Sequence, residues 1–117
     1  MRDAVRRALA ICPVEVGVAV AGGDWKLTTV SRLRGGPLRF GELQRQVGPV
    51  SAKTLTRQLR ALETDGVVIR TVYAEVPPRV TYELTEAGMA LGEIADQLGS
   101  WGKKYVGDAE EPELRSG

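Results

Sequence analysis

The chain contains no histidine and a single cysteine in 117 residues. Without histidine it lacks the commonest general base and the commonest metal ligand. The one cysteine, Cys12, can form neither an internal disulfide nor a cysteine-cluster zinc site. Aromatic residues make up only 5% of the sequence, and no apolar run approaches the ~20 residues of a membrane span. Because clustered carboxylates and phosphate-binding glycine motifs are also missing, we expect no enzymatic activity, bound metal or cofactor.

What is present fits one small domain with unevenly distributed charge. Residues 1–10 carry three arginines but no long apolar segment, so we expect a cytoplasmic protein without a signal peptide or membrane contact. The formal net charge of +1 hides an asymmetry. Residues 1–60 hold eleven Lys and Arg against four Asp and Glu, whereas residues 61–117 hold five against eleven. This segregation favours an anion-binding face, with a chance distribution of surface charge as the alternative.

Glycines and prolines divide the first half of the chain into short segments. Pro13 suits the first position of a helix that ends before Gly22, and Asp24 suits the N-cap of the next helix. The patterns predict helices over 13–21, 25–34 and 41–47, with a small strand or extended entry at 38–40. Proline does not continue a helix, so residues 48–50 form a tight turn.

The segment 51–65 gives the clearest helical pattern. Ser51 suits its N-cap, and Gly66 suits the residue that follows its end. At 100° per residue the predicted buried stripe is narrow, about 60° wide, and consists of Leu55, Leu59 and Leu62. The opposite side carries Lys53, Arg57, Arg60 and Thr64. This helix therefore combines an apolar inner face with a cationic outer face.

The second half of the chain predicts a hairpin and a long helix. The β-branched segment 67–73 and the alternating segment 79–84 predict two strands, joined by a loop over 74–78 that contains two prolines. Thr85 caps a helix that extends to about Tyr105. Its apolar positions recur at a 3-4 spacing: Leu84, Ala87, Leu91, Ile94, Leu98, Trp101 and Tyr105. We expect one domain over 1–106 and an acidic, flexible tail over 107–117.

This order of elements predicts an α+β fold, mainly α: a winged helix-turn-helix with a two- or three-stranded wing and flanking helices. A helix that reads the major groove needs an exposed, cationic and hydrogen-bonding N-terminal half, which the 51–65 helix has. The cations of the hairpin, Arg70 and Arg79, would lie near phosphates or the minor groove. The alternative is a solvated basic face on a helical bundle.

Several segments resemble HxlR-type transcriptional regulators. They are 12–15, 22–27, 39–43, 51–60, 62–66 and 73–85, the last of which contains the distinctive block Glu75-Val76-Pro77-Pro78-Arg79-Val80. The resemblance covers about residues 12–105. It implies a homodimeric winged-helix protein that binds operator DNA and controls transcription, with 51–65 as the recognition helix and 79–82 in the wing.

Two positions depart from the family. Asp24 stands where the family usually has lysine, and Thr28-Thr29 replaces a more aliphatic pair, which weakens the case for DNA contacts by Trp25-Lys26. Arg57 is the best candidate to read a base edge, because arginine pairs bidentately with guanine. The full set of expected DNA contacts is Lys26, Arg39, Ser51, Lys53, Thr54, Thr56, Arg57, Arg60, Arg70 and Arg79.

The last helix has more apolar length than so small a domain needs, and its spacing suits packing against another helix. The predicted dimer contacts are Leu91, Ile94, Leu98, Trp101 and Tyr105. The alternative is that this stripe covers the domain's own core. A dimer would place two recognition helices about 34 Å apart, on a pseudo-palindromic site.

Two routes of regulation are also open. Cys12 lies at the expected N-cap of the 13–21 helix, where backbone amides and the helix dipole stabilise negative charge. Because several members of the resembled family sense oxidants with a cysteine at this place, Cys12 is a candidate sensor; the alternative is an inert buried thiol. A small apolar effector could lie among Trp25, Trp101 and Tyr105, which equally suit an aromatic core. A winged-helix module that binds protein and not DNA is the alternative function.

Overall fold

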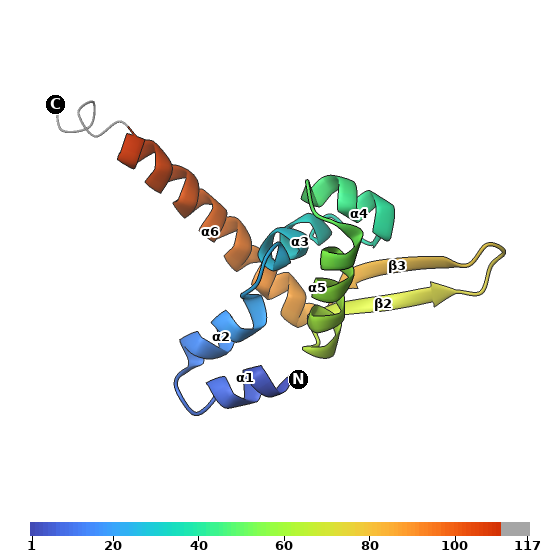
Figure 1. Cartoon of the computed structure of the whole chain (residues 1–117), viewed down its shortest axis with the longest axis horizontal. Helices are drawn as coiled ribbons and strands as arrows, with labels where there is room; N and C mark the ends of the chain where they lie inside the picture. Colours follow the sequence, from blue (N-terminus) through green and yellow to red (C-terminus); the bar gives the residue numbers. More distant parts are fainter. Residues whose placement is uncertain (111–117) are drawn as a thin grey trace.

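The computed structural model describes residues 1–110, so residues 111–117 of the expected tail lie outside the described residues. Helices and strands follow one another in the order shown in Figure 1. They are α1 (Asp3–Ala8), α2 (Pro13–Ala21), α3 (Lys26–Leu33), β1 (Leu38–Arg39), α4 (Phe40–Val47), α5 (Ala52–Thr64), β2 (Val68–Tyr73), β3 (Arg79–Leu84) and α6 (Glu86–Glu110). Apart from α1, this is the predicted order, and it gives the predicted winged helix-turn-helix.

The sheet has three antiparallel strands in the order β1-β3-β2. The central strand pairs on both sides at Tyr82, opposite Leu38 of β1 and opposite Arg70 of β2. The short strand expected near residue 38 is therefore the third strand of the wing. It ties the segment before α4 to the hairpin, so the sheet and the helix-turn-helix form one unit.

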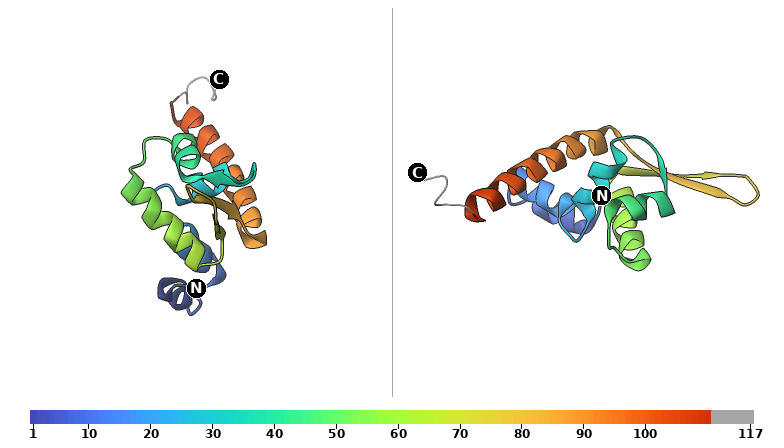
Figure 2. Two further views of the ribbon diagram at one scale, coloured as in Figure 1. Left: turned by 90° about the vertical axis from the view of Figure 1, so that its right-hand side faces the viewer. Right: turned by 90° about the horizontal axis from the view of Figure 1, so that it is seen from above.

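The core lies where α3, α4 and α5 meet the sheet, as Figure 2 shows from two further sides. The leucine stripe of α5 is fully buried there, as predicted. The buried residues that pack with it are Val30, Leu33, Leu43, Val47, Val50, Val67 and Val68. Burial of one side of α5 forces its cationic side outward.

The helix α5 begins and ends as its sequence predicts. The Ser51 Oγ accepts a hydrogen bond of 3.1 Å from the backbone N–H of Thr54, which is an N-cap contact. Gly66 has φ +74°, the left-handed conformation that glycine adopts at lowest cost after a helix. Both signals are local, so they could be predicted without the fold.

One additional helix, one helix cap and one helix end are the main differences from the predictions. The helix α1 was not predicted, because six residues with two buried apolar side chains give little periodicity. The N-cap of α3 is Trp25, with φ 71°, and not Asp24. The Asp24 carbonyl instead accepts a hydrogen bond of 2.8 Å from Gln58 Nε2, which joins this loop to α5. The last helix α6 continues through Gly107 to Glu110, past its expected end at about Tyr105.

Two parts of the molecule project from the core on the same side. One is the outer half of α6, and the other is the N-terminal arm, which we define as residues 1–21 and which holds α1 and α2. Both lie on the side opposite the tip of the β2–β3 hairpin in Figure 1 and in the right panel of Figure 2. The wing and the projecting helices are therefore at opposite ends of the molecule.

Candidate nucleic-acid interface

The outer face of α5 is cationic and open to solvent. Lys53, Arg57 and Arg60 are exposed, and with Ala52 and Thr56 they line a surface depression of about 470 Å³. Thr54 and Thr56 are half-buried, and the Ser51 hydroxyl already caps the helix. Side chains that donate hydrogen bonds therefore surround a hollow on the exposed side of a helix whose other side is fixed in the core.

The turn before α5 is held by specific contacts. Gln44 Nε2 of α4 donates a hydrogen bond of 3.0 Å to the carbonyl of Val50, just before α5 begins. The backbone N–H of Val50 donates to the carbonyl of Gly48 over 2.7 Å, and Gly48 has φ +122°. These contacts fix the angle between α4 and α5, which a helix-turn-helix needs for docking.

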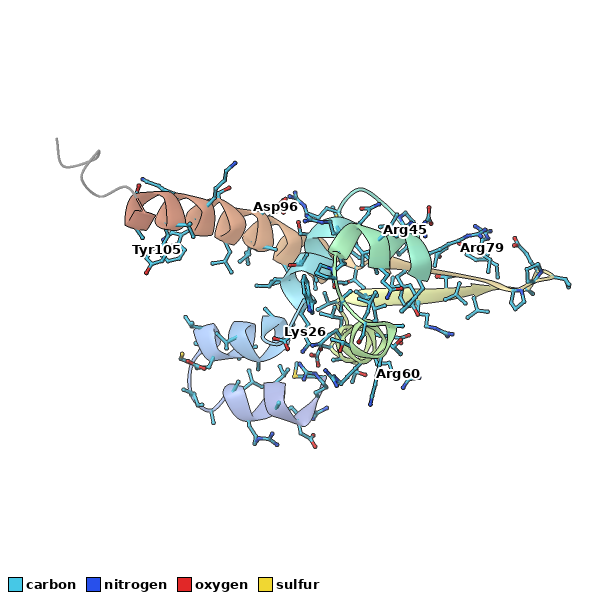
Figure 3. The ribbon with its side chains drawn as sticks, turned by 45° about the horizontal axis from the view of Figure 1, so that its top comes forward. Lys26, Arg45, Arg60, Arg79, Asp96 and Tyr105 are labelled. Atoms are coloured by element: carbon cyan, nitrogen blue, oxygen red, sulfur yellow. The ribbon has the colours of Figure 1, made fainter. Side chains whose placement is uncertain are left out.

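Arg45 is a further candidate DNA contact, which the sequence patterns did not indicate. It is exposed on α4, the first helix of the helix-turn-helix, which crosses the DNA backbone in proteins of this architecture. Figure 3 shows Arg45, Arg60 and Arg79 on the half of the molecule that holds α4, α5 and the wing. The only sign of this contact in the sequence is that Arg45 lies in the helix before the predicted turn, and no periodic pattern distinguishes it from other cations.

In the wing, Arg79 is held by two neighbours. Its guanidinium carbon lies 3.9 Å from the centroid of the Tyr73 ring, a cation–π contact. Its Nη2 and Nε donate to the Glu75 carboxylate over 3.2 and 3.4 Å. Arg79 is thus oriented at the base of the hairpin loop, but its charge is partly neutralised by Glu75.

The other two cations of the sheet lie on different edges. Arg70 of β2 is exposed and lines a depression of about 430 Å³ with Thr56, Arg60, Glu63 and Tyr82, so it belongs to the α5 surface. Arg39 is exposed at the end of β1, on the opposite edge of the sheet. Its backbone N–H donates to Glu42 Oε1 at the start of α4.

Lys26 does not belong to this surface, and that prediction is wrong. Its side chain is 4% exposed, beneath the surface at the start of α3. Burial lowers the pKa of its amine, and the nearby Arg2 lowers it further, while the Asp65 carboxylate acts in the opposite direction. The sequence showed only a lysine after a tryptophan, whereas its burial depends on the arm and on the end of α5.

The predicted dimer contacts divide into two groups. Leu91 is half-buried and packs against the domain's own core. Ile94, Leu98, Trp101 and Tyr105 are exposed on α6, and the Trp101 and Tyr105 rings stack with their centroids 5.1 Å apart. The arm exposes further apolar side chains at Leu9, Ile11, Val14 and Val18.

Cys12 has the predicted position: it is the N-cap of α2 with Pro13 as the first helical residue. It is a free, half-buried thiol. The predicted aromatic pocket is not formed, because Trp25 packs on the core while Trp101 and Tyr105 stack on the surface of α6. A depression of about 520 Å³ lies instead between α3 and α6, and its lining includes Leu27, Arg32 and Lys103.

Asp96 also lines the depression between α3 and α6. Its carboxylate accepts hydrogen bonds from Ser31 and Arg34. These bonds lower its pKa below the ordinary value for a carboxyl. Both hydrogen bonds of Asp96 therefore link α6 to α3.

Within the described part of the chain, no helix has the length and apolar character needed to cross a membrane.

Comparison with known proteins identifies the architecture. The family described as HxlR-like helix-turn-helix matches residues 20–110. An uncharacterized HTH-type transcriptional regulator of Methanothermobacter thermautotrophicus is 47% identical over 95 residues, which is 81% of this chain and 72% of that protein. The regulator YtcD of Bacillus subtilis, also uncharacterized, is 45% identical over 93 residues, or 80% of this chain and 74% of its own length.

A solved structure described as the redox regulator HypR in its reduced form is also similar. It is 41% identical, with a TM-score of 0.78 over 85% of this chain and 98% of that chain. The oxidised form of HypR gives 44% identity and a TM-score of 0.74, over 80% of this chain and 96% of that chain. With its helix-turn-helix and wing in the predicted order, the chain belongs to the HxlR-like helix-turn-helix family of DNA-binding transcriptional regulators.

Proposed function

We propose that the protein binds a pseudo-palindromic operator as a homodimer and has no catalytic role. One observation carries this proposal: the exposed Lys53, Arg57 and Arg60 lie on the α5 face opposite a fully buried leucine stripe. A helix fixed in this way presents its cationic side to the major groove. Such a regulator acts on chromosomal DNA, so we place it in the cytoplasm.

The proposed contacts have different tasks. Arg57, at the centre of the exposed face, reads a guanine edge, while Lys53, Thr54, Thr56 and Arg60 contact neighbouring bases or phosphates. Ser51 contributes through the N-cap of α5. Arg39, Arg45, Arg70 and Arg79 contact the flanking backbone. Phosphate contacts release counterions from the DNA. Each contact that is lost should therefore reduce the slope of the logarithm of the binding constant against the logarithm of the salt concentration by about one.

Binding of a labelled duplex from upstream of the protein's own gene tests this function. We expect an affinity that falls steeply between 50 and 200 mM salt, by roughly a thousandfold for six phosphate contacts. A duplex with a scrambled sequence is the matched control and should bind more weakly. Salt-insensitive binding, or no binding to any duplex, would contradict the proposal and favour a protein-interaction module.

The dimer interface that we propose joins α6 and the arm of each protomer to those of its partner. Its support is the apolar surface at the end of the molecule opposite the wing, where Ile11, Val14, Leu98 and Trp101 are at least half exposed. Exposed apolar side chains gathered at one end of a molecule often mark an interface between proteins. It lies away from the cationic face, so a dimer leaves both copies of α5 free.

We also propose that Cys12 is a thiol sensor. Its support is its place at the N-cap of α2, within the proposed interface, and the similarity to a redox regulator known in both oxidation states. Treatment with diamide should change operator affinity in the wild type and not in Cys12→Ser. An identical response of the two proteins would contradict the sensor role and leave the DNA-binding role intact.

A further inference from the structure

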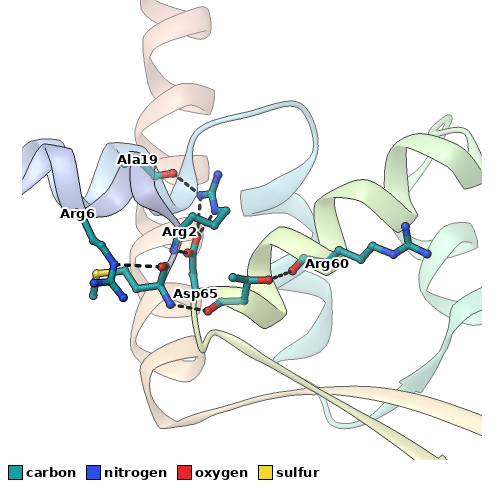
Figure 4. Close-up of polar contacts among 7 residues, drawn as sticks. Arg2, Arg6, Ala19, Arg60 and Asp65 are labelled. Carbon is teal, nitrogen blue, oxygen red and sulfur yellow. Dashed lines mark hydrogen bonds and ion pairs between the residues drawn. The ribbon is translucent and has the colours of Figure 1, made fainter.

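The carboxylate of Asp65, at the C-terminal end of α5, is buried against the first residues of the chain. Its side chain is only 1% exposed. Oδ1 accepts a hydrogen bond of 2.9 Å from the backbone N–H of Arg2, and Oδ2 accepts one of 2.7 Å from Arg2 Nε. Arg2 Nη2 also lies 2.7 Å from Oδ2 (Figure 4). One arginine therefore holds both oxygens of the last carboxylate of the recognition helix.

The same arginine is also bound to α2. Its Nη2 donates a hydrogen bond of 2.8 Å to the carbonyl of Ala19, two residues before α2 ends. Arg2 thus joins three segments that are distant in sequence: the start of α1, the end of α2 and the end of α5. We call this set of contacts among Arg2, Ala19 and Asp65 the clasp.

The charges of the clasp indicate a role in geometry, since the Asp65 side chain is 1% exposed and that of Arg2 is 29% exposed. Lys26 lies near enough for its charge to act on both Arg2 and Asp65. Buried ion pairs often stabilise a fold no better than apolar side chains of the same size, because both charges lose their hydration. Their strict hydrogen-bond geometry instead favours one arrangement of the elements that they join.

The covalent link between the arm and the rest of the domain does not supply that arrangement. Gly22 and Gly23 separate α2 from α3, and Gly23 has φ +121°, in a region open mainly to glycine. No residue of α2 is fully buried, and Val20 is its one side chain that packs against the main core. The arm is therefore attached through two glycines and one apolar contact of α2, and the clasp supplies the polar contacts that fix its angle to α5.

We infer that Arg2 and Asp65 are positioning residues that set the distance between the two α5 helices of the dimer. The inference rests on the proposed function, in which the arm forms part of the dimer interface. Because the interface is on the arm and the DNA-reading side chains are on α5, the angle between them sets the spacing of half-sites. A displacement of α5 by about 3.4 Å corresponds to one base step. The clasp therefore determines which half-site spacing the protein accepts.

The first experiment measures this angle without DNA. Spin labels at Ala10→Cys on the arm and Glu63→Cys on α5, in a Cys12→Ser background diluted with unlabelled protein, report the distance within one chain. We expect a narrow distribution in the parent and a clearly broader one in Arg2→Gln. Arg7→Gln, which changes an exposed arginine on the same helix, is the control and should stay narrow. Equal widths in the parent and Arg2→Gln would overturn the inference.

The second experiment measures spacing preference. A duplex selected in vitro with the wild-type protein is compared with versions whose half-sites are one base pair closer or farther, and with a single half-site. For Arg2→Gln we expect at least tenfold weaker binding to the selected spacing, a smaller preference among spacings, and single half-site affinity within twofold of wild type. An equal loss on all duplexes would indicate general damage to α5 and would overturn the inference.

Two controls separate the inference from loss of folding and from failure of the proposed function. Asp65→Asn leaves Arg2 and Lys26 without their carboxylate, so Arg2→Lys, which keeps the charge but not the double contact, is tested beside it. Both variants should broaden the label distance while they remain folded by circular dichroism. If the distances behave as expected but the wild type binds no duplex, the clasp positions the arm and the proposed function fails.

Discussion

The two ends of this small domain are built from opposite chemistry. At the end that holds α4, α5 and the wing, arginine and lysine side chains are exposed while the leucines of α5 are buried. At the end that holds the arm and the outer half of α6, apolar side chains such as Trp101 and Val14 are exposed. A monomer gains nothing from that exposure, since burial of apolar surface is what stabilises a fold. This difference is the reason for proposing one surface for DNA and another for a second copy of the chain.

The largest effect that we expect comes from the apolar end. Trp101→Ala removes a large side chain that is 63% exposed and stacked on Tyr105. If this ring is an anchor of the dimer, its loss should weaken association by about 2–4 kcal/mol. Sedimentation equilibrium measures this directly, with Gln97→Ala on the same helix as the control. A dimer that is unchanged in Trp101→Ala would show that this end serves another purpose.

A smaller and more selective effect is expected from the basic end. Arg57→Ala should cost roughly 1–3 kcal/mol of operator affinity and relax specificity at one base position. The reason is that a bidentate arginine discriminates one base pair from the others. Binding to a set of duplexes with single substitutions measures it, and Arg7→Ala is the control for charge. An equal loss of affinity on every duplex would show that Arg57 contacts a phosphate and not a base.

The smallest expected effect is a loss of folding stability at low pH, because acid protonates Asp65 in the clasp between the two ends. Burial alone would raise the pKa of the Asp65 carboxyl, but the hydrogen bonds and charge of Arg2, together with Lys26, hold that pKa below its ordinary value. Since the folded state favours the ionised form, Asp65 contributes stability above the ordinary carboxyl pKa of about 3.9. That contribution is lost as the pH falls through the lower pKa of the folded state.

Melting temperatures of the wild type and Asp65→Asn between pH 2 and pH 7 test this expectation. The wild type should lose stability on acidification, and the variant should lose less, because its amide does not titrate. Asp3→Asn, at an exposed carboxyl on α1, should follow the wild type. Parallel curves for the wild type and Asp65→Asn would contradict the role assigned to Arg2.

Much of the fold could be predicted from the sequence because its signals are local. The Ser51 cap, the leucine stripe and Gly66 define α5 within one segment, and alternation defines β2 and β3. The exposed cations of α5 followed from the same periodicity. The residues whose surroundings the sequence did not indicate lie where distant segments meet: Lys26 is buried near Arg2 and Asp65, and Leu91 packs on the core.

Which elements form, and which side of α5 faces water, can be derived from the sequence, because helix caps, glycine conformations and apolar periodicity act over a few residues. How these elements are joined depends on tertiary contacts. Arg2 and Asp65 are 63 residues apart, and neither lies in a pattern that points to the other. Their pairing exists because folding brings the arm to the end of α5, where a buried carboxylate requires a hydrogen-bonded cation.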